Sequence, residues 1–507
     1  MAQISVSNLT FAYDGSFDNI FEKVSFSVDT NWKLGFIGRN GKGKTTFLNL
    51  LLGKYEYSGS IHTTTVFDYF PYQIAEEQKE RCFAELMEEL KEGSELWRVI
   101  CELETLDADA ELLYRPFSTL SHGERTKVML ALLFSRENDF LLIDEPTNHL
   151  DGETRELVKA YLQKKKGFIL VSHDRDLLDA CIDHVLVLNR ATIEVQAGNF
   201  SSWWENKSRK DAFSIAENEK HKREIGKLEE ASRRMQTWAE KAEGKKIGFN
   251  PLKEHDRSAG TRPYLAAKAK KMQSRAKQVE GRIEREIEAK EGLLQDIENP
   301  VDLKLMPQKH HKERLILAKE YSLSYGEKSV LKNFEFELKQ GERVVLHGKN
   351  GCGKSSFLKA VLLRAGVLAD APNSLSEQGT LEVAAGLSVS YVNQDTSFLK
   401  GGLKTYAREQ NMEESLFFAI LRQLDLERVQ FEKQMEEYSE GQKKKVLLAT
   451  SLLKPAHIYI WDEPLNYIDV FSRMQIEKLI LQYEPTMLFV EHDVRFREKI
   501  STRVVNV

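Results

Sequence analysis

Cysteine is scarce in this chain, and the few residues are far apart. Cys82, Cys101, Cys181 and Cys352 form no CxxC or Cys/His pattern. The spacing therefore excludes the usual zinc and iron–sulfur ligand patterns and a disulfide framework. We interpret the cysteines as reduced thiols, most of them buried.

Long hydrophobic runs are absent as well. No stretch approaches the roughly 18 consecutive apolar residues that a membrane-spanning helix needs. The first residues also lack the basic segment, apolar run and small-residue cleavage site of a secretion signal. We expect a cytoplasmic protein that does not insert into a membrane.

The length and the composition favour a globular protein of several domains. A chain of 507 residues is too long for one hydrophobic core, and about three folded units are expected at that length. Apolar residues make up 41% of the chain, which is enough to build sizeable cores.

Positive charge is concentrated in the middle of an otherwise acidic chain. The net charge is −5, yet residues 205–300 hold 23 Lys and Arg against 18 Asp and Glu, and residues 241–285 hold 13 against 5. Such a basic segment favours a polyanionic partner. A solvated helical face is the alternative interpretation.

One ordered set of motifs occurs twice, which predicts two related domains. Each set opens with the phosphate-loop pattern GxxxxGK[ST], at residues 38–45 and 348–355, after a strand-like apolar run. The glycines let backbone N–H groups wrap phosphates, the lysine reaches the outer phosphates, and the hydroxyl binds Mg²⁺. The nucleotide-binding residues predicted from the loops are Gly38, Asn40, Gly41, Gly43, Lys44, Thr45 and Thr46 in the first half and Gly348, Asn350, Gly351, Gly353, Lys354, Ser355 and Ser356 in the second.

Each half then carries an acidic pair at the end of an apolar strand, Asp144-Glu145 and Asp462-Glu463. The first carboxylate of a pair can hold Mg²⁺, and the second can orient and polarise a water for attack on the γ-phosphate. The predicted metal ligands are therefore Thr45, Asp144, Ser355 and Asp462, and the predicted catalytic residues include Glu145 and Glu463.

A histidine follows the next strand-like run in each half, His173 and His492. A lone histidine is usually structural or exposed. At the end of a strand beside a phosphate site, it can instead contact the γ-phosphate. We add both histidines to the predicted catalytic residues.

Between the phosphate loop and the acidic pair lie the segments LSHGE at residues 120–124 and YSEGQ at residues 438–442. They resemble the LSGGQ signature of ATP-binding-cassette domains, and all these motifs occur in that family's order in both halves. The resemblance implies an α/β fold with two tandem cassettes, each a P-loop NTPase core with a helical subdomain. It also implies that each ATP lies between the phosphate loop of one cassette and the signature of the other, so that Lys44 faces Ser439 and Lys354 faces Ser121.

The resemblance assigns further residues and exposes departures. It adds Ser121, Gly123, Ser439 and Gly441 of the signatures, Tyr13 and Tyr325 as adenine-stacking rings, and Gln394 as a metal contact. Each tyrosine is equally explained by ordinary packing. His122 and Glu440 replace a signature glycine, and a residue with a Cβ atom resists positive φ there, so we expect weakened closure. Gln73 stands one place later than the family pattern.

A segment between the halves distinguishes the subfamily. Apolar residues recur at alternating spacings of three and four, which predicts two long antiparallel helices. We divide the chain into a first cassette (1–204), a helical hairpin (205–312) with its tip near 245–262, and a second cassette (313–507). The residues of the predicted seam are Ile225, Leu228, Met235 and Trp238, then Leu265, Ala269, Met272, Ala276, Val279 and Ile283.

Two fused cassettes joined by a charged hairpin resemble the ABC-F family of ribosome-acting ATPases, and most of all its Lsa-type antibiotic-resistance factors. The resemblance implies a monomer with cofactors ATP and Mg²⁺ that binds the bacterial 70S ribosome in the exit-tRNA site. Its hairpin would contact 23S rRNA and peptidyl-site tRNA and displace lincosamides, pleuromutilins or group A streptogramins. The hairpin residues expected at RNA or at the drug site are Lys245, Lys246, Phe249, Lys253, Arg257, Arg262 and Tyr264.

Three other functions share parts of this pattern. A housekeeping ABC-F translation factor has every motif and no drug phenotype. The ATPase subunit of a membrane transporter would lack the long hairpin. A DNA-repair ATPase would favour duplex DNA over ribosomes.

Overall fold

The structure is a computed structural model of the whole chain. It describes residues 3–13, 19–39, 41–136, 139–148, 150–189, 192–244, 270–271, 274, 277–279, 281–283, 305–326, 328–349, 351–368, 375–424, 426 and 428–507, with the backbone alone at 235, 236, 238–244, 328 and 375. The described chain divides into two compact units, residues 1–203 with 300–507, and residues 204–299.

The first half of the larger unit combines two sheets. A three-stranded antiparallel sheet has the order β2-β1-β4, and a six-stranded sheet has the order β5-β6-β7-β3-β8-β9, parallel except for β9. Strand β7 and the four central residues of β6 are apolar and buried, as expected where both faces of a parallel sheet are covered. The strands are β1 Gln3–Phe11, β2 Phe21–Asp29, β3 Lys33–Ile37, β4 Ser58–His62, β5 Val66–Phe70, β6 Asp139–Asp144, β7 Phe168–Val171, β8 His184–Asn189 and β9 Thr192–Ala197.

Helices of the first half follow the parallel strands or form a separate group between β5 and β6. The helices are α1 Lys44–Leu51, α2 Phe83–Leu90, α3 Leu96–Thr105, α4 His122–Leu133, α5 Gly152–Gln163 and α6 Arg175–Cys181, with short 3₁₀ turns η1 Glu76–Gln78, η2 Ala110–Tyr114 and η3 Phe117–Thr119. The group α2 to α4 corresponds to the predicted helical subdomain.

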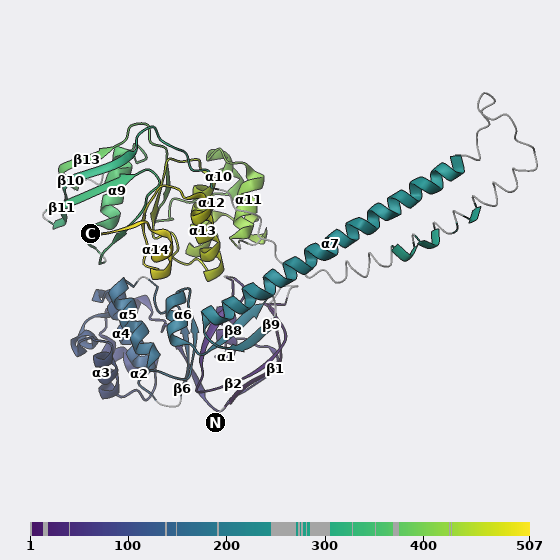
Figure 1. Cartoon of the computed structure of the whole chain (residues 1–507). Helices are drawn as coiled ribbons and strands as arrows, with labels where there is room; N and C mark the ends of the chain where they lie inside the picture. The colour runs from purple at the N-terminus through teal and green to yellow at the C-terminus, as the bar shows by residue number, and fades with distance from the viewer. Residues whose placement is uncertain are drawn as a thin grey trace, which may run out of the picture. The chain divides into compact units, whose positions relative to one another are not determined.

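The second half repeats this design. Its antiparallel sheet has the order β11-β10-β13 and packs against α9 (Figure 1), while its parallel sheet has the order β14-β15-β16-β12-β17. The strands are β10 Arg314–Tyr325, β11 Lys328–Lys339, β12 Arg343–His347, β13 Leu375–Val383, β14 Val389–Val392, β15 Ile458–Asp462, β16 Met487–Val490 and β17 Arg503–Asn506. The helices are α9 Lys354–Arg364, α10 Leu403–Glu409, α11 Glu414–Gln423, α12 Glu440–Leu453, α13 Val470–Tyr483 and α14 Val494–Ile500, with η4 Arg428–Glu432 and η5 Met435–Glu437.

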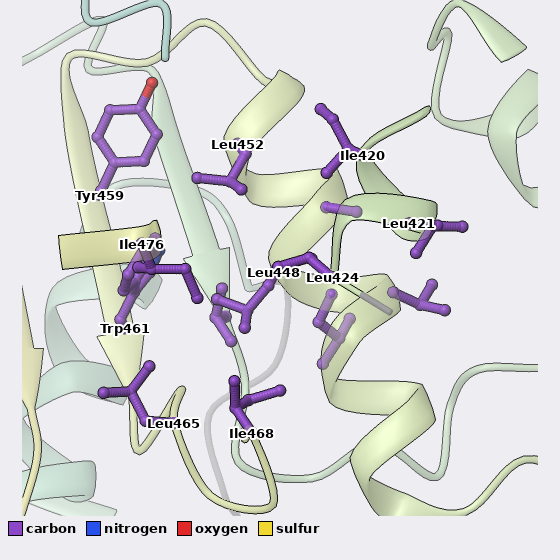
Figure 2. Close-up of a cluster of buried hydrophobic side chains, with 14 of the residues drawn as sticks. Ile420, Leu421, Leu424, Leu448, Leu452, Tyr459, Trp461, Leu465, Ile468 and Ile476 are labelled. Atoms are coloured by element: carbon purple, nitrogen blue, oxygen red, sulfur yellow. The ribbon is translucent and has the colours of Figure 1, made fainter. Parts of the chain in front are cut away.

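A buried apolar cluster fixes the helices of the second half onto β15. Trp461 at the centre of β15 is fully buried, and its indole N–H donates to Ser451 Oγ at 2.9 Å. Trp461 belongs to one buried cluster with Leu448 and Leu452 of α12 and Leu421 of α11 (Figure 2). Strand β15 also carries Asp462, so this packing fixes the position of the acidic pair.

The smaller unit contains most of α7, which runs from Phe200 to Gly244 as a single helix of 45 residues (Figure 1). The described residues between 270 and 283 are helical too. Among the predicted seam residues whose side chains are described, Ile225 and Ile283 are buried, and Leu228 and Val279 are half-buried. The side chains of Met235, Trp238, Leu265, Ala269, Met272 and Ala276 lie outside the described part of the chain. The division into domains at 204 and 312 and the antiparallel pairing of the hairpin stay predictions.

Two expectations are tested by the fold itself. The α/β architecture with two repeated halves is confirmed. The expectation that most cysteines are buried is wrong, because Cys181 is buried, Cys82 and Cys352 are half-buried, and Cys101 is exposed.

Candidate nucleotide-binding sites

Each phosphate loop leaves the carboxyl end of a central parallel strand and leads into a helix. Gly43 and Gly353 cap α1 and α9 with left-handed φ values of 104° and 107°. A Cβ atom on Gly43 would lie 2.6 Å from Ile20 Cγ2, so both space and conformation require glycine there. Gly41 and Gly351 also have positive φ but face open space.

The loop lysines are buried and bond to their own loops. The Lys44 ammonium donates to the carbonyl oxygens of Gly38 at 2.8 Å and Arg39 at 3.1 Å. Lys354 makes the same pair of bonds to Gly348 and Lys349, at 2.7 and 2.8 Å. Each cation therefore lies inside the curve of its loop, where the outer phosphates of a nucleotide would be recognised.

The predicted metal ligands come together in both halves. Thr45 Oγ1 donates to Asp144 Oδ2 at 3.0 Å, and Ser355 Oγ donates to Asp462 Oδ1 at 3.2 Å. A hydroxyl beside a carboxylate next to a phosphate loop is an oxygen donor set of the kind that Mg²⁺ prefers. The residues present therefore fit Mg²⁺ with ATP at both sites.

The backbone conformation and one backbone hydrogen bond fix the position of the second residue of each acidic pair. Glu145 and Glu463 have φ values of 52° and 47°, and their N–H groups donate to Val171 and Val490 at the ends of the neighbouring strands. His173 Nε2 lies 3.2 Å from Glu145 Oε1. The corresponding distance from His492 to Glu463 is 3.5 Å, too long for a well-formed hydrogen bond.

The two glutamates differ in their proton affinity. Burial, followed by repulsion from Asp144, raises the pKa of Glu145 to about 8. Burial opposes ionisation of Glu463 as well, but the nearby His492 and the Asn466 amide, which donates to it at 2.8 Å, hold its pKa below the ordinary value. Two glutamates in equivalent positions are therefore not chemically equivalent.

Buried polar atoms point to missing partners. Among the described residues, Glu145 Oε1 and His492 Nε2 are buried and take part in no hydrogen bond, although Glu145 Oε1 lies 3.2 Å from His173 Nε2. Such atoms normally find a partner. A water beside the glutamate and a phosphate oxygen beside the histidine are the partners that the predicted chemistry would bring.

The signature serines begin helices. Ser121 and Ser439 cap α4 and α12, accepting from the N–H of Glu124 at 3.3 Å and of Gln442 at 3.4 Å. The side chains of Glu124 and Gln442 accept from the serine N–H groups in return, at 2.7 and 3.0 Å, which completes a capping box in each half.

The expected strain in the signatures is wrong. His122 and Glu440 are the first residues of α4 and α12, and neither has the positive φ that would penalise a Cβ atom. The backbone of a helical first turn has negative φ values, so any side chain fits there unless it clashes with a neighbouring residue. The expectation of weakened closure from backbone strain therefore has no basis in the structure.

In the described part of the chain, residues of both halves line two of the cavities. One of 470 Å³ joins Gly41, Glu145 and His173 to residues of the second signature, including Ser439 and Gly441. The other, of 380 Å³, joins Gly353, Lys354 and His492 to His122 and Arg155. His122 takes the place expected for Ser121 in the second cavity. His122 also lines a third cavity of 630 Å³, together with Thr45, Asp144 and Glu145.

Other predicted nucleotide contacts lie at the edges of the loops. The Tyr13 hydroxyl is 2.7 Å from Thr46 Oγ1, and the Tyr325 hydroxyl donates to Ser356 Oγ at 3.3 Å. Tyr13 also packs edge-on against Phe11, with ring centroids 5.1 Å apart. Both the packing and the nucleotide-facing interpretations of the tyrosines are therefore consistent with the structure.

The glutamine positions differ between the halves. Gln394 donates to Glu463 Oε2 at 2.9 Å, within the second nucleotide site. Gln73 is exposed and does not line the cavity at Asp144, whereas Tyr69 and Tyr72 do. Tyr69 is not among the predicted residues, yet its hydroxyl donates to Asp144 Oδ2 at 3.2 Å. Its only sequence signal is its place in the strand before the glutamine motif.

Several predicted residues lie outside the described residues. They are Asn40 and Asn350 of the phosphate loops and Lys245, Lys246, Phe249, Lys253, Arg257, Arg262 and Tyr264 of the hairpin.

Comparison with known families matches the same two regions. The family model described as ABC transporter matches residues 21–148 and 331–466, slightly more than half of the chain. The chain belongs to the ABC transporter family. Among the described residues, no helix is long and apolar enough to cross a bilayer.

Relatives of this ABC protein cover nearly its whole length. The ribosome protection protein VmlR of Bacillus subtilis (strain 168) is 27% identical over 506 residues, covering 98% of this chain and 85% of that protein. The ATP-binding protein Uup of Buchnera aphidicola subsp. Acyrthosiphon pisum (strain APS) is 25% identical over 525 residues, covering 98% of this chain and 79% of that protein. Both alignments include the segment between the halves.

Solved structures agree on the fold. The archaeal ribosome recycling factor aABCE1, solved with the ribosomal stalk protein aP1, has a TM-score of 0.60 at 19% identity, covering 98% of this chain and 87% of that one. At that identity the likeness shows the fold alone. Together, the family match and the relatives identify the chain as an ABC-F protein and an ATPase, as the motifs predicted.

Proposed function

We propose that this ABC-F ATPase is a ribosome protection factor that binds the bacterial 70S ribosome in its ATP-bound form. The observation that carries the proposal is the similarity to VmlR, a ribosome protection protein, over 98% of this chain. The basic segment within residues 241–285 supports it, because ribosomal RNA is a polyanion. The chain acts in the cytoplasm as a monomer.

ATP acts on the two halves as a clamp. Residues of both halves line the cavities at Gly41 and at Lys354, so a nucleotide in either cavity contacts both and favours their closed arrangement. Hydrolysis removes the γ-phosphate contacts and lets the halves reopen. Closure creates the surface that binds the ribosome, and reopening permits release.

In this proposal each residue of the nucleotide sites has a specific role. Lys44 and Lys354 bind the outer phosphates, and Glu145 and Glu463 orient the attacking water while His173 and His492 contact the γ-phosphate. Thr45 and Asp144 would hold Mg²⁺ in the first site, and Ser355, Asp462 and Gln394 would hold it in the second, where the ion would neutralise phosphate charge. Tyr13 and Tyr325 stack on adenine, and the remaining loop and signature residues donate backbone N–H groups to phosphate.

The hairpin carries the effect to the drug site. In this proposal the protein enters the exit-tRNA site, and residues Lys245 to Tyr264 contact 23S rRNA and peptidyl-site tRNA. The contacts dislodge lincosamides, pleuromutilins or group A streptogramins from the peptidyl-transferase region. Removal of the positive charges of Lys245 and Lys246 should weaken ribosome binding and reduce its dependence on salt.

A cosedimentation experiment tests the proposal. The double variant Glu145→Gln with Glu463→Gln should bind ATP without hydrolysing it, and should therefore sediment with bacterial ribosomes in ATP but not in ADP. The control is Lys44→Ala with Lys354→Ala, which removes phosphate binding and should stay in the supernatant in both nucleotides. A glutamine variant that binds ATP yet ignores ribosomes would refute the ribosome proposal.

A susceptibility measurement separates drug protection from housekeeping translation. Expression of the intact chain in a sensitive bacterium should raise the inhibitory concentration of at least one of the three drug classes. Ribosome binding with unchanged susceptibility to all three would favour a housekeeping ABC-F factor.

A further inference from the structure

The registers of the two parallel sheets define which residues of the halves are equivalent. Phe70 pairs with Ile143, the residue before Asp144, and Val392 pairs with Trp461, the residue before Asp462. Phe70 and Val392 therefore occupy the same place. Counting onward along both chains aligns Pro71 with Asn393 and Tyr72 with Gln394.

The position of the metal-site glutamine is thus a tyrosine in the first half. Gln394 reaches into the second site and donates to Glu463. The Tyr72 hydroxyl instead donates to Asp68 Oδ2 at 2.7 Å. A phenol bound in this way offers no amide oxygen to a metal ion.

The Tyr72 position is held by a buried charge. Asp68 also pairs with Lys91 Nζ at 2.9 Å, and Lys91 pairs further with Asp139 at 3.1 Å. Lys91 is 7% exposed, so its buried ammonium fixes the position of the Asp68 carboxylate that accepts from Tyr72. The second half has Ser390 at the place of Asp68, and Ser390 bonds to Ser451 and not to Gln394 among the described contacts.

A second tyrosine of the first half, Tyr69, makes a polar contact with the acidic pair. Tyr69 and Tyr391 are equivalent by the same register. The Tyr391 hydroxyl donates to Asn393 Oδ1 at 3.0 Å. The first half has Pro71 at the place of Asn393, which offers no side-chain acceptor. The Tyr69 hydroxyl donates to Asp144 Oδ2 at 3.2 Å instead.

We propose that the first nucleotide site binds Mg²⁺ without a glutamine ligand, and that Tyr69 is the positioning residue that orients Asp144 for the metal. The hydroxyl occupies one lone pair of Oδ2 and fixes the rotation of the carboxylate, as outer-shell partners of metal ligands do. The two sites therefore differ in metal affinity, with the first the weaker. The inference rests on Mg²⁺ binding at both sites but not on the ribosome.

Manganese binding tests the inference without any need for hydrolysis. Lys354→Ala leaves only the first site able to hold nucleotide, and Lys44→Ala leaves only the second. Each protein is titrated with Mn²⁺ in the presence of the non-hydrolysable analogue AMP-PNP, and bound Mn²⁺ is measured by electron paramagnetic resonance. The Mn²⁺ dissociation constant should be higher at the first site than at the second.

Tyrosine variants in these two backgrounds assign the cause. Tyr69→Phe should weaken Mn²⁺ binding at the first site by about 10-fold, in the range expected for an outer-shell partner. Tyr391→Phe, the matched change in the second half, should leave Mn²⁺ binding at the second site unchanged. Tyr72→Gln should tighten binding at the first site, and Tyr72→Phe, which adds no amide, should not.

Equal Mn²⁺ affinities at the two sites would overturn the proposal, as would a Tyr69→Phe protein that binds Mn²⁺ like its parent. Urea unfolding of each variant shows whether it is folded, and AMP-PNP binding in the absence of metal shows whether the phosphate loop is intact. Ribosomes are absent from all these measurements, so failure here is distinguishable from failure of the ribosome proposal.

Discussion

Lys91 illustrates at the scale of one residue how a buried charge stabilises the first half. Its ammonium contacts two carboxylates, Asp68 and Asp139, and also donates to the Leu133 carbonyl oxygen at 2.8 Å. The three partners lie on β5, on β6 and at the end of α4, so one side chain joins the helical group to the parallel sheet. Loss of such a cation leaves buried carboxylates without compensation.

Lys91→Met should therefore lower the free energy of unfolding of the first half by about 3 kcal/mol. Urea unfolding monitored by tryptophan fluorescence provides the measurement. Lys79→Met is the control, since Lys79 pairs with Glu76 at the surface and should contribute less than about 1 kcal/mol. Equal effects of the two changes would contradict the role given to burial.

The site residues can be predicted from the sequence where a fixed motif specifies their chemistry. Lys44, Thr45 and Asp144 come together as the motifs predict. Tyr69 was not predictable, because its acceptor depends on Pro71 lacking a side-chain oxygen and on the register of β5 against β6. Sequence spacing specifies which residues follow a strand but not which hydrogen bond a hydroxyl will choose.

At the scale of elements, the signature segments are helix N-termini with capping boxes. The first box uses Glu124 and the second uses Gln442, and both accept from the serine N–H. An amide oxygen and a carboxylate oxygen fill the same place. The serine hydroxyl, by contrast, has no substitute in an alanine side chain.

Ser121→Ala should destabilise the first turn of α4 by about 1 kcal/mol. Faster amide hydrogen exchange at the start of α4, measured by mass spectrometry, would show the loss. Glu124→Gln, which copies the box of the second half, should leave exchange almost unchanged. A large effect of Glu124→Gln would mean that charge, and not the capping geometry, stabilises this turn.

The elements themselves followed from the sequence more closely than their conformational details. The strand-like run expected before the first phosphate loop is β3, Lys33–Ile37. The prediction of a positive φ at His122 is wrong. It rests on the glycine of the family pattern, whereas the first turn of a helix does not require a positive φ. Periodicity predicts where a helix lies, and the dihedral angles at its end depend on the cap.

At the scale of the molecule, ion pairs connect the two halves outside the nucleotide sites. Arg175 of α6 bonds to Glu477 of α13, with one contact at 3.2 Å, and both side chains are buried. Arg495 of α14 lies 3.2 Å from Asp176 and 2.5 Å from Asp179. It also donates to Ser201 Oγ at 3.2 Å, in the first turn of α7.

Arg495→Ala should make closure of the halves less favourable by about 1 kcal/mol, since its ion pairs are partly exposed. The ATP concentration for half-maximal closure, measured by energy transfer between dyes on the two halves, should rise severalfold. Arg503→Ala is the matched control, because Arg503 bonds to Glu337 and Glu342 within its own half. Equal shifts for both variants would contradict the assignment.

His122 borders the cavity that holds Thr45 and Asp144 and also the cavity that holds Lys354 and His492. The His122 imidazole thus lines both cavities, so a ligand that displaces it in one cavity changes the shape of the other cavity. Coupling between two binding equilibria is reciprocal. If nucleotide bound at the first site changes the affinity of the second site for nucleotide by some factor, nucleotide bound at the second site must change the affinity of the first by the same factor. This equality holds even if the two sites hydrolyse ATP at different rates.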